Sequence, residues 1–88
     1  MNLFILFRTT IGGEPEDSSG IDTISASGTK EQALAMLPNG YTERELTDEE
    51  DSFLECNVGD ACKLLEVTSP GVATVLSTTW FYPPNVAA

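Results

Sequence analysis

The sequence contains no histidine, so the most common general base near neutral pH is missing. Neither a Ser–His–Asp triad nor a Cys–His pair can be built from the residues present. Paired carboxylates can also carry acid–base chemistry, but Glu43 and Glu45 adjoin a highly charged segment that gives no sign of a pocket. We therefore expect a protein that is not an enzyme.

Basic residues are scarce. Four Lys and Arg stand against fourteen Asp and Glu, which gives a formal net charge of −10. This balance argues against direct binding of nucleic acid or of an anionic membrane surface. It favours a partner protein with a basic surface, or a cation. The alternative interpretation is that the charge only keeps a small protein soluble.

Cysteine is limited to Cys56 and Cys62. Their spacing matches neither a zinc pair nor a C-x-x-C redox motif, and no histidine can complete a metal site. We expect free thiols in a reducing compartment, with a disulfide between the two as the alternative. The run Asp48–Asp51 offers hard oxygen ligands without the pattern of an EF-hand loop. The sequence therefore predicts neither a specific metal site nor a cofactor.

Long hydrophobic runs are absent as well. The unbroken apolar run Leu3–Phe7 is far shorter than the ~20 residues of a membrane span. No basic residue precedes it, which is unlike a signal peptide. We expect a cytoplasmic protein without membrane association, and 88 residues suit one small domain over 1–88.

Helix signals cluster after residue 28. Thr29 and Gln32 have the spacing of a capping box, helix-forming residues follow, and Pro38 must end the helix, which predicts a helix over 30–37. An Asn-Gly turn then leads into a predicted strand over 41–46.

A second T-x-x-E capping box opens at Thr47, and acidic residues occupy the first turn, where the helix dipole favours them. This pattern predicts a short helix over 48–56. The alternative is an acidic loop there, with a helix over 60–66 instead.

The remaining strands are predicted from apolar runs, alternation and β-branched residues. They cover 2–10, 21–27, 61–68 and 72–82, and Ser69-Pro70-Gly71 forms a turn between the last two. The run Leu3–Phe7 is typical of a strand buried on both faces, one of which a partner subunit could cover. The predicted fold class is α+β, in the order strand, strand, helix, strand, helix, strand, strand. Its four to five strands form one mainly antiparallel sheet, with one or two short helices on one face.

Acidic residues make up seven of the thirteen positions between 43 and 55. Such a group can imitate the charge spacing of a nucleic-acid backbone and attract grooves lined with Lys and Arg. A solvated helix N-terminus accounts for the acids at 48–51, but less well for the others. The predicted partner-binding residues are Glu43, Glu45, Asp48, Glu49, Glu50, Asp51 and Glu55.

Charged residues are absent from Val67 to the end of the sequence, and aromatic residues there alternate between both faces of the predicted strand. One face could therefore be an interface rather than core. The alternative function is that of a self-associating structural or assembly protein. Both a monomer and a homodimer are compatible with the sequence, and the monomer is the favoured expectation. The predicted self-association residues are Phe4, Leu6, Trp80, Phe81 and Tyr82.

In its size, acidity, lack of catalytic residues and small α+β pattern, the chain resembles small inhibitors encoded by phages or mobile elements. Anti-CRISPR proteins and other nucleic-acid mimics belong to that class. The resemblance rests on composition, and no motif matches residue by residue. It implies an inhibitor or adaptor that blocks the basic, nucleic-acid-binding surface of a host defence or regulatory complex.

Overall fold

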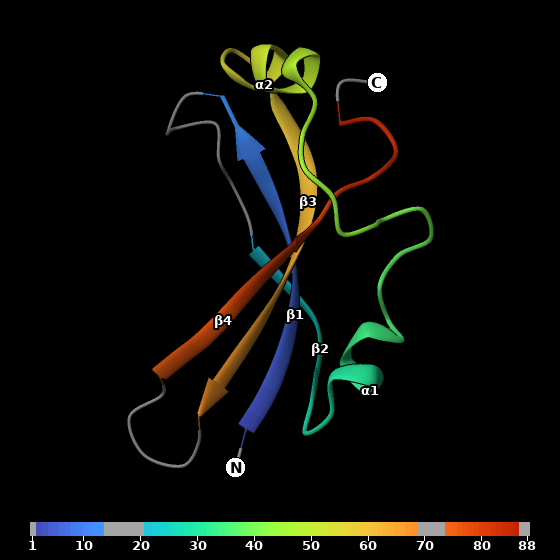
Figure 1. The fold of residues 1–88 in the computed structure, drawn as a ribbon, viewed down its shortest axis with the longest axis vertical. Helices are drawn as coiled ribbons and strands as arrows, with labels where there is room; N and C mark the ends of the chain where they lie inside the picture. The colour runs from blue at the N-terminus through green and yellow to red at the C-terminus, as the bar shows by residue number, and fades with distance from the viewer. Residues whose placement is uncertain (1, 14–20, 69–73, 87–88) are drawn as a thin grey trace.

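The computed structural model describes residues 2–13, 21–68 and 74–86. Along the chain it has the strands β1 (Asn2–Gly12) and β2 (Ile21–Ser27), then the helices α1 (Lys30–Leu34) and α2 (Asp48–Leu54) (Figure 1). The strands β3 (Val58–Thr68) and β4 (Thr74–Phe81) follow. The predicted α+β class is therefore confirmed.

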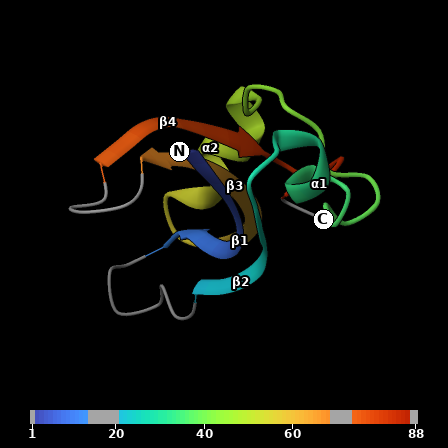
Figure 2. The same cartoon turned by 90° about the horizontal axis from the view of Figure 1, so that it is seen from below.

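The four strands form one sheet in the order β2-β1-β3-β4, and every neighbouring pair is antiparallel. The two long strands β1 and β3 lie in the centre, and β2 and β4 form the edges. The sheet is twisted, with α1 beside one of its faces (Figure 2). The predicted turn at 69–71 and the start of the predicted last strand at 72–73 lie outside the described residues.

Helix α1 begins at the predicted N-cap, where the Thr29 side chain accepts a hydrogen bond from the Gln32 backbone N–H. The predicted capping box is not completed, because the Thr29 backbone N–H donates to the Ser27 hydroxyl, which in turn donates to the Gln32 side chain. It ends at Leu34 rather than at 37. Just before Pro38 the backbone hydrogen bonds join residues three apart instead of four, as in the bond from the Leu37 N–H to the Leu34 carbonyl. The proline prevents the helix from continuing, and these three-residue bonds satisfy the last carbonyl groups.

The predicted strand over 41–46 is wrong. Only Thr42 pairs, through two backbone hydrogen bonds of 2.9 Å with Tyr82, and the chain from residue 43 to Thr47 is irregular. The side chain of Arg44 turns instead toward α2. The alternating pattern of residues 41–46 is therefore outweighed by the ion pair between Arg44 and Glu50. The described sheet has four strands, the lower of the two predicted numbers.

Helix α2 is confirmed with its capping box, although it ends at Leu54 rather than at 56. The alternative helix over 60–66 is wrong, because β3 occupies those residues and pairs with β1 along its whole length. Strand β4 ends at Phe81, and Tyr82 contributes only the isolated bridge.

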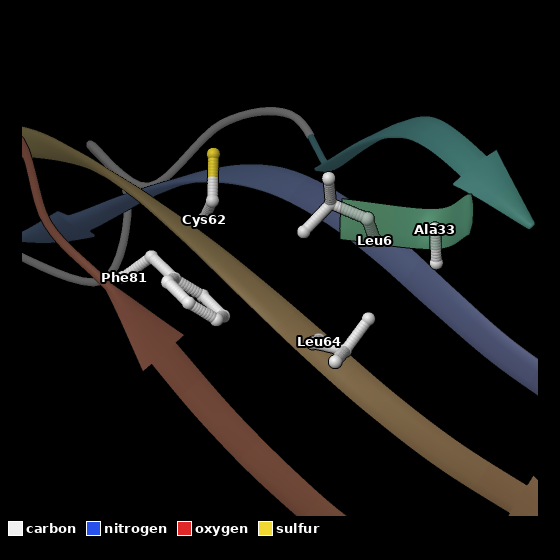
Figure 3. Close-up of a cluster of buried hydrophobic side chains, with 5 residues drawn as sticks. All are labelled: Leu6, Ala33, Cys62, Leu64 and Phe81. Atoms are coloured by element: carbon white, nitrogen blue, oxygen red, sulfur yellow. The ribbon is translucent and has the colours of Figure 1, made fainter. Parts of the chain in front are cut away.

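The core lies between the sheet and α1 (Figure 3). Its buried members are Leu6, Ala33, Cys62, Leu64 and Phe81. The hydroxyl of Ser25 donates to the Ala33 carbonyl at 2.8 Å and so ties α1 to β2. Leu6 is fully buried, whereas Leu3, Ile5 and Phe7 are only half-buried. Strand β1 is therefore not buried on both faces as predicted.

Candidate binding surfaces

Glu50 and Arg44 form a paired unit at the start of α2. The two guanidinium nitrogens donate to the two carboxylate oxygens at 2.8 and 2.9 Å. The Thr47 backbone N–H donates to the same carboxylate at 3.0 Å, and the Val86 N–H donates to it at 2.8 Å. Arg44 also donates to the Pro83 carbonyl. One carboxylate thus joins the helix cap, the irregular segment before α2 and the C-terminal segment.

These donors keep Glu50 ionised inside the protein. The hydrogen bond from Arg44, followed by those from the Thr47 and Val86 backbone, holds the pKa of Glu50 far below its ordinary value. The residue is only 4 % exposed. Glu50 therefore does not lie on the accessible acidic surface, which corrects its place among the predicted partner-binding residues.

The other six predicted residues are exposed, and we call them the acidic surface: Glu43, Glu45, Asp48, Glu49, Asp51 and Glu55. The ion pairs of the described residues are Arg8–Asp60 and Arg44–Glu50, so none of the six takes part in one. Residues 43–55 contain seven acids and one Arg, and pairing of Arg44 with Glu50 leaves six uncompensated negative charges.

Local helix chemistry explains part of this surface. Asp48, Glu49 and Asp51 lie in the first turn of α2, where negative charge is favourable. Glu55 caps the opposite end, where negative charge is unfavourable, and the last turn has no basic residue. Glu43 and Glu45 lie outside the helix altogether. Helix stabilisation therefore does not account for these three residues.

Two cationic side chains lie over aromatic rings, Lys63 of β3 over rings of β1 and β4, and Arg44 over the ring of Tyr82. The Lys63 ammonium lies 5.8 Å from the Phe7 ring centroid and 5.7 Å from that of Trp80. The Trp80 and Tyr82 rings stack with centroids 6.2 Å apart, and the Arg44 guanidinium lies 5.7 Å from the Tyr82 centroid. Such contacts hold the long cationic side chains against the sheet.

The five predicted self-association residues differ in their exposure. Leu6 and Phe81 belong to the buried core, and Phe4 packs partly buried against it. Tyr82 is half-buried, and Trp80 is exposed. Leu6 and Phe81 therefore cannot contribute to an interface while the fold persists, and Trp80 is the residue that remains accessible.

A hollow of about 420 Å³ was not predicted from the sequence. Its lining consists of Thr10, Tyr41, Val58, Gly59, Asp60, Pro83, Asn85 and Val86. At its edge, Arg8 donates to Asp60 at 3.2 Å, and both side chains are about half exposed. These two residues are 52 positions apart and are joined only by the pairing of β1 with β3. Burial raises the pKa of the Tyr41 hydroxyl and so favours its neutral form.

Both cysteines are free, as expected, with Cys56 exposed and Cys62 buried. Burial raises the pKa of the Cys62 thiol, which disfavours the reactive thiolate. Within the described ranges, no group of three or more His, Cys, Asp or Glu is placed to hold a metal ion.

The described part of the chain has no helix that is long and apolar enough to cross a membrane. Comparison of the chain with protein-family models, with curated proteins and with solved structures finds no match in any of the three.

Proposed function

We propose that the protein is a non-enzymatic inhibitor or adaptor of the cytoplasm that binds, through its acidic surface, a basic nucleic-acid-binding surface of a partner protein. The observation that carries the proposal is the pairing of Arg44 with Glu50. It neutralises the one cation of residues 43–55 and leaves six exposed carboxylates uncompensated.

The carboxylates stand on an anchored backbone. The Glu50 carboxylate accepts hydrogen bonds from Thr47 and Val86 as well as from Arg44, so the segment before α2 is held to the helix and to the C-terminal segment. A held array of like charges attracts a complementary array over roughly 8–10 Å at moderate salt and loses little entropy on binding. This arrangement suits mimicry of a phosphate backbone, as in the small phage-encoded inhibitors that the chain resembles.

Glu43 and Glu45 allow the cleanest test, because neither supports the α2 dipole. The double variant Glu43→Gln/Glu45→Gln changes the net charge by two while it leaves the capping box in place. The matched control is Asp22→Asn/Glu31→Gln, which removes two exposed carboxylates elsewhere and gives the same net charge. Each tagged protein is used to capture partners from a bacterial lysate, with washes at rising salt and with competitor DNA.

We expect a captured protein that is released by moderate salt and displaced by DNA, because both agents compete for electrostatic contacts at a nucleic-acid site. Its capture should fall about tenfold in the Glu43→Gln/Glu45→Gln variant and remain near the wild-type level in the control. Equal capture by the two variants, or a partner that resists both salt and DNA, refutes the role of the acidic surface.

A further inference from the structure

The hollow of about 420 Å³ lies on the face of the sheet that also carries the core. Strands β1 and β3 pair without a register shift, and alternate residues of a strand share a face. Thr10 and Asp60 are partners in this pairing, so they lie on the same face as the core pair Leu6 and Leu64. None of the described lining residues belongs to α1, and residues of the C-terminal segment line this part of the face instead.

The lining of the hollow combines apolar side chains with a few polar groups. The polar groups belong to Thr10, Tyr41, Asp60 and Asn85, and the apolar side chains to Val58, Pro83 and Val86. Small-molecule sites have the same mixture and a volume of roughly 300–1,000 Å³, a range that includes this hollow. The hollow therefore has the size and the lining of a site for a small molecule.

Both signs of charge meet at this hollow. Asp60 brings a carboxylate to the lining, and Arg8 donates to one oxygen of that carboxylate at 3.2 Å. Both side chains are about half exposed, and water weakens such a pair. Tyr41 interacts electrostatically with both charges, and its neutral hydroxyl can donate a hydrogen bond. A ligand can therefore exchange the single bond between Arg8 and Asp60 for contacts of its own.

The charges of the protein select the charges of the ligand. A simple anion at Arg8 meets the carboxylate of Asp60 and a chain of net charge −10, which repel it. A simple cation at Asp60 meets the guanidinium of Arg8. A ligand with one charge of each sign compensates both side chains and is itself neutral overall. In an α-amino acid the two charged groups stand on one carbon atom, which matches two side chains within hydrogen-bond distance of each other.

We propose that the hollow binds a small aliphatic α-amino acid. Its carboxylate accepts hydrogen bonds from Arg8 and Tyr41, and its ammonium group donates to Asp60. Its aliphatic side chain packs against the apolar part of the lining. The proposal goes beyond the acidic-surface function and does not depend on it, because neither Arg8 nor Asp60 belongs to that surface.

A titration of the wild-type protein, followed by the amide signals in nuclear magnetic resonance, is the first test. The ligands are L-leucine and its two single-charge analogues, isocaproate without the amino group and isoamylamine without the carboxylate, at constant ionic strength. We expect leucine to shift the amides of Thr10, Tyr41 and Asp60 in a saturable way, and to leave that of Glu66 at the far end of β3 unchanged. Each analogue should bind about tenfold more weakly or worse. No saturable shift with leucine, or equal binding of an analogue, overturns the proposal.

Two single-charge variants test the role of each side chain. Asp60→Asn should weaken leucine binding about tenfold and strengthen binding of isocaproate, because the repelling carboxylate is gone. Arg8→Gln should weaken leucine binding to a similar extent and strengthen binding of isoamylamine. These opposite responses to the analogues distinguish loss of one contact from loss of the fold, which weakens all three ligands.

The matched controls are Glu31→Gln and Lys30→Gln, which remove the same charges from exposed positions outside the hollow. All three affinities should stay within about twofold of the wild-type values in these controls, because distant exposed charges are screened. Leucine binding that is unchanged in Asp60→Asn or in Arg8→Gln contradicts the proposal, as does an equal loss in the controls.

Discussion

Arg44 donates two hydrogen bonds of 2.8 and 2.9 Å to the carboxylate of Glu50, which is almost fully buried. The pair holds three separate segments together and also neutralises the single cation of an otherwise acidic stretch. Stability and surface charge are therefore set by the same contact.

Replacement of Glu50 by Gln should destabilise the protein strongly. The amide keeps the size of the side chain but leaves Arg44 without its counter-charge, and breaking a buried pair is costly. We expect the melting temperature, followed by circular dichroism, to fall by about 10 °C or more. Glu49→Gln, at the exposed neighbouring position, should change it by no more than about 3 °C.

Acid should remove the Glu50 contribution. Because the pKa of Glu50 is lowered in the folded protein, its stabilising effect is present above the unfolded pKa and is lost as pH falls toward the folded pKa. From about pH 4.5 downward, the stability difference between wild type and Glu50→Gln should shrink steadily. Urea titrations of both proteins at several pH values measure this difference in the free energy of unfolding. A difference that does not change with pH contradicts the lowered pKa of Glu50.

Gly12 and Gly28 should differ in their tolerance of alanine. Gly12 has a φ of +80°, and an added Cβ meets the Asn57 carbonyl oxygen at 2.7 Å and Leu54 Cβ at 2.8 Å. Gly12→Ala should lower the free energy of unfolding by about 1–3 kcal/mol. Around Gly28 nothing lies within 4 Å of the added carbon, so Gly28→Ala should leave stability unchanged or raise it by up to about 1 kcal/mol.

Two neighbouring aromatic residues of β4 should respond unequally to truncation. Phe81 lies in the core, so Phe81→Ala should cost about 3–5 kcal/mol of unfolding free energy. Trp80 is partly exposed on the other face, and Trp80→Ala should cost about 1–2 kcal/mol. Urea denaturation at low protein concentration separates these values from any effect of association, and equal losses exclude the observed orientation of the strand.

Thiol labelling should distinguish the two cysteines. In the native protein Cys56 should react rapidly, whereas Cys62 should react only on unfolding, because it is buried and its pKa is raised. The stoichiometry with a chromogenic disulfide reagent should be one per native chain and two in denaturant. Two fast-reacting thiols in the native protein contradict the burial of Cys62.

Elements with local signals in the amino-acid sequence could be predicted without knowledge of the fold. The N-cap residues Thr29 and Thr47 set the starts of both helices, and Pro38 kept the first of them short. Alternation of β-branched and aromatic residues predicted the last strand for the same reason, since neighbouring side chains decide these preferences. The exposed acids around α2 could be recognised from their density alone.

Features that depend on contacts between residues distant in the chain could not be predicted in this way. The prediction of a strand over 41–46 was wrong because the Arg44 side chain bonds to Glu50 and to the Pro83 carbonyl. The same contacts bury Glu50, so it is not part of the acidic surface. The strand order β2-β1-β3-β4 brings Arg8 and Asp60 together in an ion pair and places β4 at an edge of the sheet. Local patterns carry no information about which strand lies next to which, because that order is set by burial of the shared core around Leu6 and Leu64.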